Sequence, residues 1–163
     1  MRMKLPILLL LATGMSVAQT PSVTVAPYHL EGSRPLQQQT AQAVVRDYLE
    51  AWQSLHAAFA HNQPDLLGRD FTGTAQTQLT EAIHKQSALG LHTAYNDQAH
   101  SIQIVFYSPD GLSLQMIDTV TYTQQVFAGN QSIARQPMKA RYVVVMTPAE
   151  RRWQVRVFQA QRP

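Results

Sequence analysis

Hydrophobic and polar residues alternate with a period of two between residues 112 and 127. The even positions up to residue 122 are apolar with one exception, and the odd positions are polar apart from Ile117, a pattern typical of a β-strand with one buried face. The exception is Asp118, and a carboxylate on a buried face needs a partner or access to water. Asp118 is therefore the strongest candidate for a site residue in the sequence.

Two segments before this strand follow the helical period instead. Apolar residues recur at steps of three and four from about residue 36 to residue 60, which predicts a long amphipathic helix. A second helix is expected over residues 74–89, where Gly90 supplies a stop signal, and a short turn is expected at residues 64–67. His56 lies beside the apolar face of the first helix and is interpreted as a histidine at the edge of the core.

A meander of four antiparallel strands is predicted next, and its turns indicate a register. Pro109-Asp110-Gly111 suits a three-residue hairpin loop, which pairs Ile102 with Asp118. Gly129-Asn130 suits a two-residue loop, which pairs Asp118 with Arg141, and a third loop aligns the last strand. The three loops agree on one apolar face, formed by Ile102, Ile104, Phe106, Leu112, Leu114, Met116, Val120, Val143, Val145, Trp153, Val155 and Val157.

This register predicts an α+β fold in which a long N-terminal helix and shorter helices pack on a curved, cone-like, four-stranded antiparallel sheet. Asp118 then lies opposite Arg141 as a cross-strand ion pair on the inner face. Pro137 cannot donate to a strand ladder, so a bulge near it would change this pairing. The outer face carries residues that are expected to form a homodimer surface or to receive the N-terminal leader, namely Tyr142, Val144, Met146 and Phe158.

The domain predicted from these elements spans residues 36–163, and a separate segment precedes it. Residues 19–35 contain three prolines and little periodicity, which indicates an extended leader or tether. Val23 and Val25 within this leader favour a short edge strand.

Residues 1–18 are predicted to be a signal peptide. They begin with Arg2 and Lys4, continue as an apolar run and end in small residues, with cleavage expected near Ala18. The apolar run is too short for a transmembrane helix. The mature chain is therefore expected to be exported, either periplasmic or secreted, without a transmembrane span. Loss of the two basic residues lowers the formal net charge from +3 to +1.

Basic residues gather near the end of the chain, where Glu150 is the only acidic residue among them. This cluster is interpreted as a solvated outer face of the sheet, and attraction of a polyanion or an anionic membrane surface is the alternative. Aromatic residues are not interleaved with it, so nucleic acid is not expected as a partner. The cluster consists of Arg135, Lys139, Arg141, Arg151, Arg152, Arg156 and Arg162.

Residue content disfavours several kinds of site. The chain has no cysteine, which excludes disulfides, thiolate metal ligands and a thiol nucleophile. Its six histidines include no pair four residues apart on one helix, so no metal site is expected. The sequence lacks a nucleophile elbow, a phosphate-binding loop and a dinucleotide fingerprint, so no cofactor is expected.

Several short segments carry a family resemblance: Tyr48-Leu49 with Trp52, Leu66-Leu67, Phe71-Thr72-Gly73-Thr74-Ala75, Tyr142, and Arg152-Trp153-Gln154-Val155. Together with the order and length of the predicted elements, they resemble the nuclear transport factor two-like (cystatin-like) superfamily over residues 36–159. Within it they are most similar to the non-enzymatic domain at the C-terminus of plastid division proteins and their bacterial relatives. The resemblance implies a cone-shaped sheet around the first helix. The predicted export differs from that setting, so no role in division is inferred.

The superfamily includes binding scaffolds and enzymes, so two functions are compared. The first is a non-catalytic domain that binds a small hydrophobic ligand or a peptide, or associates with itself, through the cone or the sheet surface. The second is an isomerase, lyase or hydrolase that uses Asp118 as a general base. The first is favoured because Arg141 would lower the pKa of Asp118 and weaken it as a base. The residues expected at the site are Asp118, Arg141, Tyr48, Tyr122, His100 and Trp52.

Overall fold

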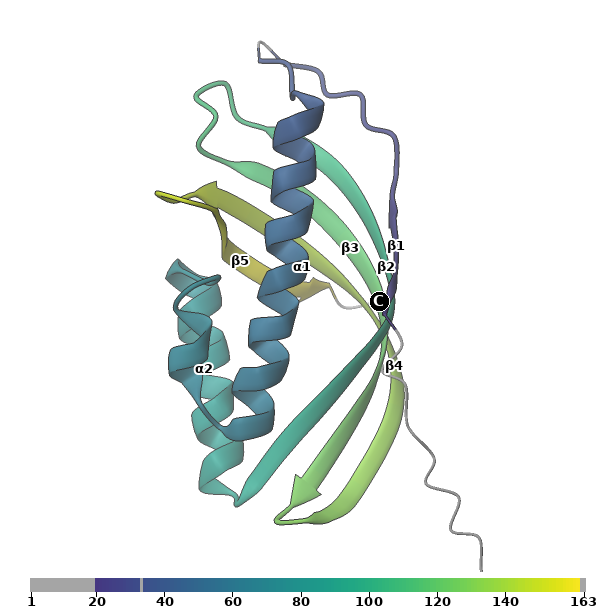
Figure 1. Ribbon diagram of the computed structural model, residues 1–163, viewed down its shortest axis with the longest axis vertical. Helices are drawn as coiled ribbons and strands as arrows, with labels where there is room; N and C mark the ends of the chain where they lie inside the picture. The colour runs from purple at the N-terminus through teal and green to yellow at the C-terminus, as the bar shows by residue number, and fades with distance from the viewer. Residues whose placement is uncertain (1–19, 33, 162–163) are drawn as a thin grey trace, which may run out of the picture.

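The computed structural model describes residues 20–32 and 34–161, and it has an α+β fold in which the helices lie on one side of a single curved sheet (Figure 1). The sheet contains five strands in the order β1-β2-β3-β4-β5. The last four form the predicted antiparallel meander, whereas β1 lies parallel to β2 at the edge. The predicted signal peptide and Arg162 lie outside the described residues.

The elements follow one another in the predicted order, with one strand added from the leader. None of the helices in the described ranges is long and apolar enough to cross a membrane. Their bounds are β1 Ser22–Val25, α1 Gln38–His61, the 3-10 turn η1 Pro64–Leu67, α2 Gly73–Ala88, β2 Leu91–Tyr107, β3 Leu114–Ala128, β4 Gln131–Pro148 and β5 Trp153–Gln161.

Helix α1 lies at the centre of the core because one broad stripe of its surface is apolar. The sheet curves around this stripe, and α2 lies on the same concave side, where it contacts β5 and where Gln86 donates to the Phe59 carbonyl near the end of α1 (Figure 1). The helix ends at Asn62, whose left-handed backbone turns the chain and whose side-chain amide donates to the Leu91 carbonyl at 2.9 Å. The buried apolar residues of the stripe are Ala41, Val44, Tyr48, Ala51, Trp52, Leu55, Ala58 and Phe59.

The first hairpin of the meander confirms the predicted register in its middle. The confirmed pairs are Ile104 with Met116 and Ile102 with Asp118. An extra residue in β2 at Val105 changes the pairs that lie between this point and the loop, so that Phe106 lies opposite Gln115. Phe106 and Leu112, both expected in the core, are therefore 47% and 59% exposed.

The second hairpin has the predicted two-residue turn, but an extra residue at Ile133 forms a bulge beyond it. Because strand side chains alternate between faces, this bulge moves every later pair by one residue and reverses the face of each position in β4. Asp118 lies opposite Tyr142, while Arg141 lies on the outer face opposite Thr119. The predicted ion pair between Asp118 and Arg141 is therefore wrong.

The reversed faces of β4 also change the expected dimer surface. Val144 and Met146 are fully buried in the core instead of lying on the outer face. Tyr142 and Phe158 are half-buried and pack against the same core. The prediction of an outward patch made by these four residues is wrong, because the bulge at Ile133 turns the three β4 residues inward and an extra residue at Arg156 turns Phe158 inward.

The third predicted register also differs from the observed one. Met146 pairs with Val155, and an extra residue at Arg156 separates this pair from the pair of Val145 with Val157. Val155 is buried as predicted, whereas Val145 is only half-buried.

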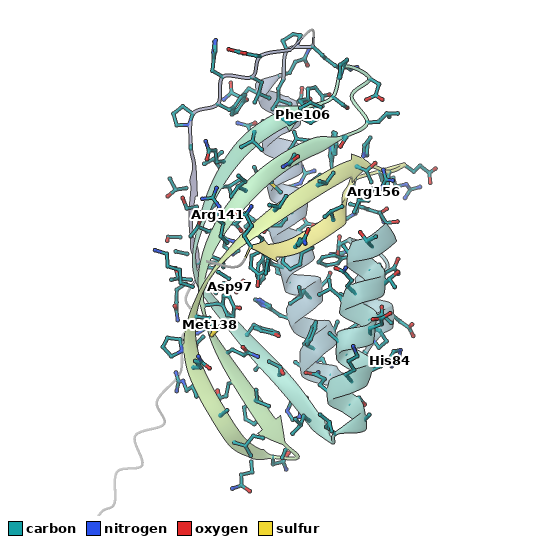
Figure 2. All side chains as sticks on the ribbon, turned by 180° about the vertical axis from the view of Figure 1, so that it is seen from behind. His84, Asp97, Phe106, Met138, Arg141 and Arg156 are labelled. Atoms are coloured by element: carbon teal, nitrogen blue, oxygen red, sulfur yellow. The ribbon has the colours of Figure 1, made fainter. Side chains whose placement is uncertain are left out.

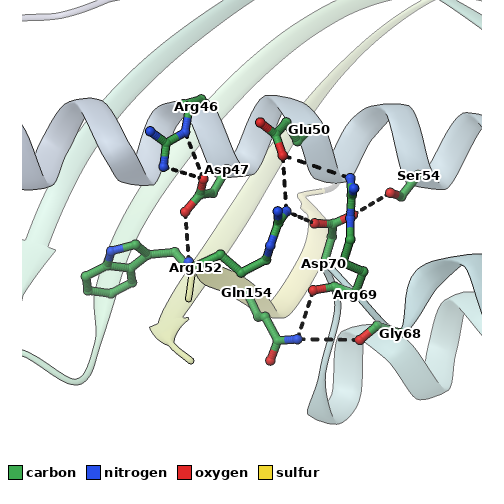
Figure 3. Close-up of polar contacts among 10 residues, drawn as sticks. Arg46, Asp47, Glu50, Ser54, Gly68, Arg69, Asp70, Arg152 and Gln154 are labelled. Carbon is green, nitrogen blue, oxygen red and sulfur yellow. Dashed lines mark hydrogen bonds and ion pairs between the residues drawn. The ribbon is translucent and has the colours of Figure 1, made fainter. Parts of the chain in front are cut away.

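A polar network fastens the start of β5 to α1 and to the segment after η1 (Figure 3). Arg152 Nη1 donates to Asp70 Oδ1 at 2.6 Å and to Glu50 Oε2 at 3.1 Å. The Trp153 backbone N–H donates to Asp47 Oδ2 at 2.8 Å. Asp70 and Asp47 are both buried, so these contacts satisfy carboxylates that would otherwise destabilise the core.

Candidate functional site

Asp118 lies fully buried on the inner face of β3, between α1 and β2. Tyr48 Oη from α1 donates to Asp118 Oδ2 at 2.8 Å, and His100 Nδ1 from β2 lies 2.7 Å from the same oxygen. The expected proximity of Tyr48 and His100 to Asp118 is therefore observed. Arg141 is absent from this group because it points to the outer face.

A second carboxylate extends the arrangement toward the surface. Asp97 Oδ2 lies 3.6 Å from His100 Nε2 and 3.1 Å from His56 Nε2. The His100 side chain is 1% exposed, whereas that of His56 is 25% exposed. We call Asp118, His100, Asp97 and His56 the acid-histidine chain, because they run in that order from the core to the surface.

The position of Asp97 depends on a bulge in β2. Residues three apart in a regular strand point to opposite faces. An extra residue at Gln98 lets Asp97 and His100 share the inner face. Asp97 was not predicted for this reason, because its spacing of three from His100 would place the two side chains on opposite faces of a regular strand.

Opposite charges shift the pKa values of His100 and Asp97. Burial disfavours the charged form of His100, but the hydrogen bonds and charges of Asp118 and Asp97 outweigh burial and raise the pKa of His100 to about 9. Burial likewise opposes ionisation of Asp97, but its histidine partners outweigh burial and keep the pKa of Asp97 below its ordinary value. Burial, followed by the nearby Asp118 charge, raises the pKa of Tyr48 well above the usual range. At neutral pH His100 is an imidazolium and Tyr48 is a neutral phenol.

Trp52 separates two cavities inside the cone. The first, of about 270 Å³, lies between α1, β2 and the residues at and just before β1, and its lining includes His56, Asp97 and His100. We call it the histidine cavity. The second, of about 260 Å³, lies between α1, α2 and the sheet, and we call it the tyrosine cavity. It is lined by Trp52, Leu55, Phe59, Gln78, Leu79, Tyr95, Tyr122, Tyr142, Phe158 and Ala160.

The tyrosine cavity combines aromatic walls with phenol groups. Trp52 contacts Phe158 edge to face at 5.5 Å between ring centroids, and Tyr142 stacks on Phe158 at 4.4 Å. Tyr122 Oη and Tyr142 Oη lie 3.5 Å apart. Burial, followed by the neighbouring Tyr122, raises the pKa of Tyr95 to about 12, and the same two causes raise the pKa of Tyr142 well above the usual range. Tyr95 and Tyr142 therefore stay protonated and can donate hydrogen bonds.

Two buried polar atoms near these cavities lack hydrogen-bond partners within residues 20–32 and 34–161. They are Trp52 Nε1 and Asp118 Oδ1. An unpaired buried donor or acceptor costs free energy, so such atoms are uncommon in folded proteins. No group of three or more His, Cys, Asp or Glu side chains in the described part of the chain has the arrangement of a metal site.

Comparison with known proteins finds no matching family model and no matching curated protein. Solved structures do match. The intermembrane space region of the chloroplast protein ARC6 has a TM-score of 0.63 and 16% identity, and the match covers 80% of this chain and all of that region. A candidate scytalone dehydratase from Novosphingobium aromaticivorans has a TM-score of 0.53 and 10% identity over 77% of this chain and 89% of its own.

A third solved structure, the Kfla4162 protein from Kribbella flavida, has a TM-score of 0.52 and 11% identity, and it covers 74% of this chain and 91% of its own. Identities this low carry information about the fold and none about shared chemistry. The chain therefore has the nuclear transport factor two-like fold expected from its sequence.

Proposed function

We propose that this chain is a non-catalytic binding domain for a small, largely apolar ligand that occupies the tyrosine cavity beside Trp52. The observation that carries the proposal is the aromatic lining of a cavity of about 260 Å³. A cavity of about 150 Å³ accommodates benzene, so this volume suits a ligand of one or two rings. The neutral phenols at its wall would orient a polar substituent of the ligand.

The environment of Asp118 supports binding rather than catalysis. Asp118 is absent from the linings of both the tyrosine cavity and the histidine cavity. Its Oδ2 is already hydrogen-bonded to Tyr48 and His100. A general base must reach the proton that it removes.

The proposal is tested with 1-naphthol, a two-ring molecule with one hydroxyl, by isothermal titration calorimetry on the chain from residue 19. Saturable binding with one site is expected. Leu79 lines the tyrosine cavity, so Leu79→Trp should fill it and weaken binding at least tenfold. Leu89→Trp is the matched control because Leu89 is 74% exposed at the end of α2. Absence of saturable binding, or equal binding by both variants, would contradict the proposal.

A second candidate function is proton transfer in the histidine cavity, as in an isomerase, lyase or hydrolase. One observation favours it: His100 lines that cavity and lies 2.7 Å from Asp118 Oδ2. Asp118 would then keep His100 protonated as the acid, and Asp97, which lines the same cavity, would be the base that removes the substrate proton.

Exchange of the α-protons of 2-tetralone for deuterium, followed by NMR, distinguishes the two functions. Catalysis predicts exchange above the buffer rate that falls at least tenfold in Asp118→Asn and stays unchanged in His84→Asn, which alters an exposed residue of α2. Binding alone predicts exchange at the buffer rate in all three proteins.

A further inference from the structure

The outer face of the sheet carries a row of basic residues along β4. The bulge at Ile133 turns Arg135, Lys139 and Arg141 to this face, and all three are exposed. The sheet bends around α1, so this face is convex, and Arg141 lies on it in the view from behind (Figure 2). We call these three residues the basic row.

The structure divides the basic cluster near the end of the chain into separate groups. Arg152 is paired with Glu50 and Asp70 on the opposite side of the sheet. Arg156 lies near the start of α2, where its Cγ approaches Gly73, away from Arg141 (Figure 2). The basic row is therefore a surface feature of its own.

Negative charge is missing around the basic row. All ten acidic residues fall in the described ranges, and none of them occupies an outer-facing position of the sheet. The β3 partners of Arg135, Lys139 and Arg141 are polar and uncharged. Arg141 Nε donates to Gln161 Oε1 at 2.7 Å, which leaves its charge uncompensated. The surrounding outer-facing hydroxyl and amide residues are Ser101, Gln103, Thr119, Thr121, Gln125, Gln159 and Gln161.

The spacing of the basic row follows the strand. A rise of about 3.3 Å per residue separates Arg135 from Lys139 by about 13 Å and Lys139 from Arg141 by about 7 Å. Within residues 20–32 and 34–161, strand β5 pairs with β4 only from Arg141 onward, so no described strand pairs with residues 131–140 on that side. An extended, linear, negatively charged chain fits such a row.

We infer that the basic row binds a linear acidic glycan, whose carboxylate or sulfate groups meet Arg135, Lys139 and Arg141. The neighbouring threonine and glutamine side chains then hydrogen-bond the sugar hydroxyls. A nucleic acid fits less well because Phe127, an aromatic residue on the outer face near Arg135, is already stacked on His92 at 5.0 Å and lies beyond the end of the row. A flat anionic membrane fits less well because the convex outer face of the sheet would contact a flat surface only along a narrow strip.

The test measures binding of two probes, heparin and polygalacturonate, by calorimetry at several salt concentrations. Arg135→Gln, Lys139→Gln and Arg141→Gln are combined in one variant. The control combines Lys85→Gln, Arg151→Gln and Arg156→Gln, which removes the same charge from exposed positions elsewhere. Circular dichroism establishes that both variants fold.

We expect at least one probe to bind, with an affinity that falls as salt rises. The basic-row variant should lose at least tenfold in affinity. The slope of its log binding constant against log salt concentration should become smaller in magnitude by about two to three. The control should lose less than threefold. Equal losses in the two variants, no binding of either glycan, or tighter binding to phosphatidylglycerol vesicles or single-stranded DNA than to either glycan would overturn the inference.

Discussion

His100 is a buried residue whose charge depends on two carboxylates. Burial alone would lower the pKa of His100, because a low-dielectric environment disfavours the charged imidazolium. Asp118 and Asp97 reverse that preference by contacting its two ring nitrogens. The charged histidine is thus part of the folded core, and its protonation contributes to stability.

We predict that the free energy of unfolding falls as pH rises from about 6.5 to above 9. The pKa of His100 is about 9 in the folded chain, above its ordinary value of 6.5. The contribution of its proton to stability is therefore complete below pH 6.5 and is lost as pH passes through 9. The pKa difference corresponds to about 3 kcal/mol as an upper bound. Urea unfolding at pH 6, 7.5 and 9.5 measures the change.

Two variants assign this pH dependence to its residue. His100→Gln should remove most of the slope between pH 6.5 and 9. His84→Gln should retain it, because His84 is exposed on α2. An identical slope in all three proteins would contradict the assignment to His100.

Among the elements, β4 shows most clearly how a bulge determines which residues face the core. We predict that Val144→Asp lowers the free energy of unfolding by about 4 kcal/mol or more, because it leaves an unpaired charge in the core. Val143→Asp should cost only about 1 kcal/mol, because Val143 is half-buried on the outer side. Chemical denaturation followed by tryptophan fluorescence compares the two. The opposite ranking would support the register without the bulge.

The sequence predicted the elements of this fold more accurately than the register of its strands. Helix α1 and strand β3 follow a single period, so their inner faces were identified correctly. Residues 142–146 of β4 are all apolar or aromatic, so either face of that segment resembles a core face. A bulge leaves the alternation intact on both sides of itself, so alternation alone does not reveal it. The turn at Gly129-Asn130 was correct, but the bulge at Ile133 made the pairing beyond it wrong.

The same limit applies to the candidate site. Asp118 stood out because it interrupts an apolar face, and Tyr48 and His100 were expected beside it. Arg141 was wrongly placed there by the missed bulge. Asp97 was overlooked because a regular strand would have turned it away from His100. Site residues on regular segments were therefore predictable, whereas those that depend on bulges were not.

The network at the start of β5 also acts at the scale of elements, since it joins β5 to α1 and η1. We predict that Arg152→Gln lowers the free energy of unfolding by about 2 kcal/mol, because it removes a charged partner from fully buried Asp70. The loss of stability is smaller than it would be if Arg152 were the sole partner of Asp70, because Ser54 and Arg69 still contact Asp70. Arg151→Gln in the same loop is exposed and should change stability by less than about 0.5 kcal/mol. Equal effects of the two substitutions in urea unfolding would contradict this role.

At the scale of the whole molecule, the segment before α1 is more than the tether that its prolines suggested, because it contacts the sheet, the histidine cavity and the core. Strand β1 adds to the sheet beside β2, and Thr20, Pro21 and Val23 form one wall of the histidine cavity. Tyr28 and Leu30 pack against the core after β1. We therefore propose that the folding unit begins near Tyr28 rather than at residue 36.

Two truncations test where the folding unit begins. A chain that starts at Pro27 loses β1, whose four residues are all exposed, together with Thr20, Pro21 and the hydrogen bond from Ala26 to Ile102, so it should still unfold cooperatively with a loss of about 2 kcal/mol relative to the chain from residue 19. A chain that starts at Leu36 also loses the packing of Tyr28 and Leu30, which should cost about 2–3 kcal/mol more. Urea unfolding monitored by far-UV circular dichroism measures both. If the chain from Leu36 is as stable as the chain from Pro27, the contacts of Tyr28 and Leu30 contribute nothing and the leader is a tether. If the chain from Pro27 is already unfolded, β1 belongs to the cooperative core even though its side chains are exposed.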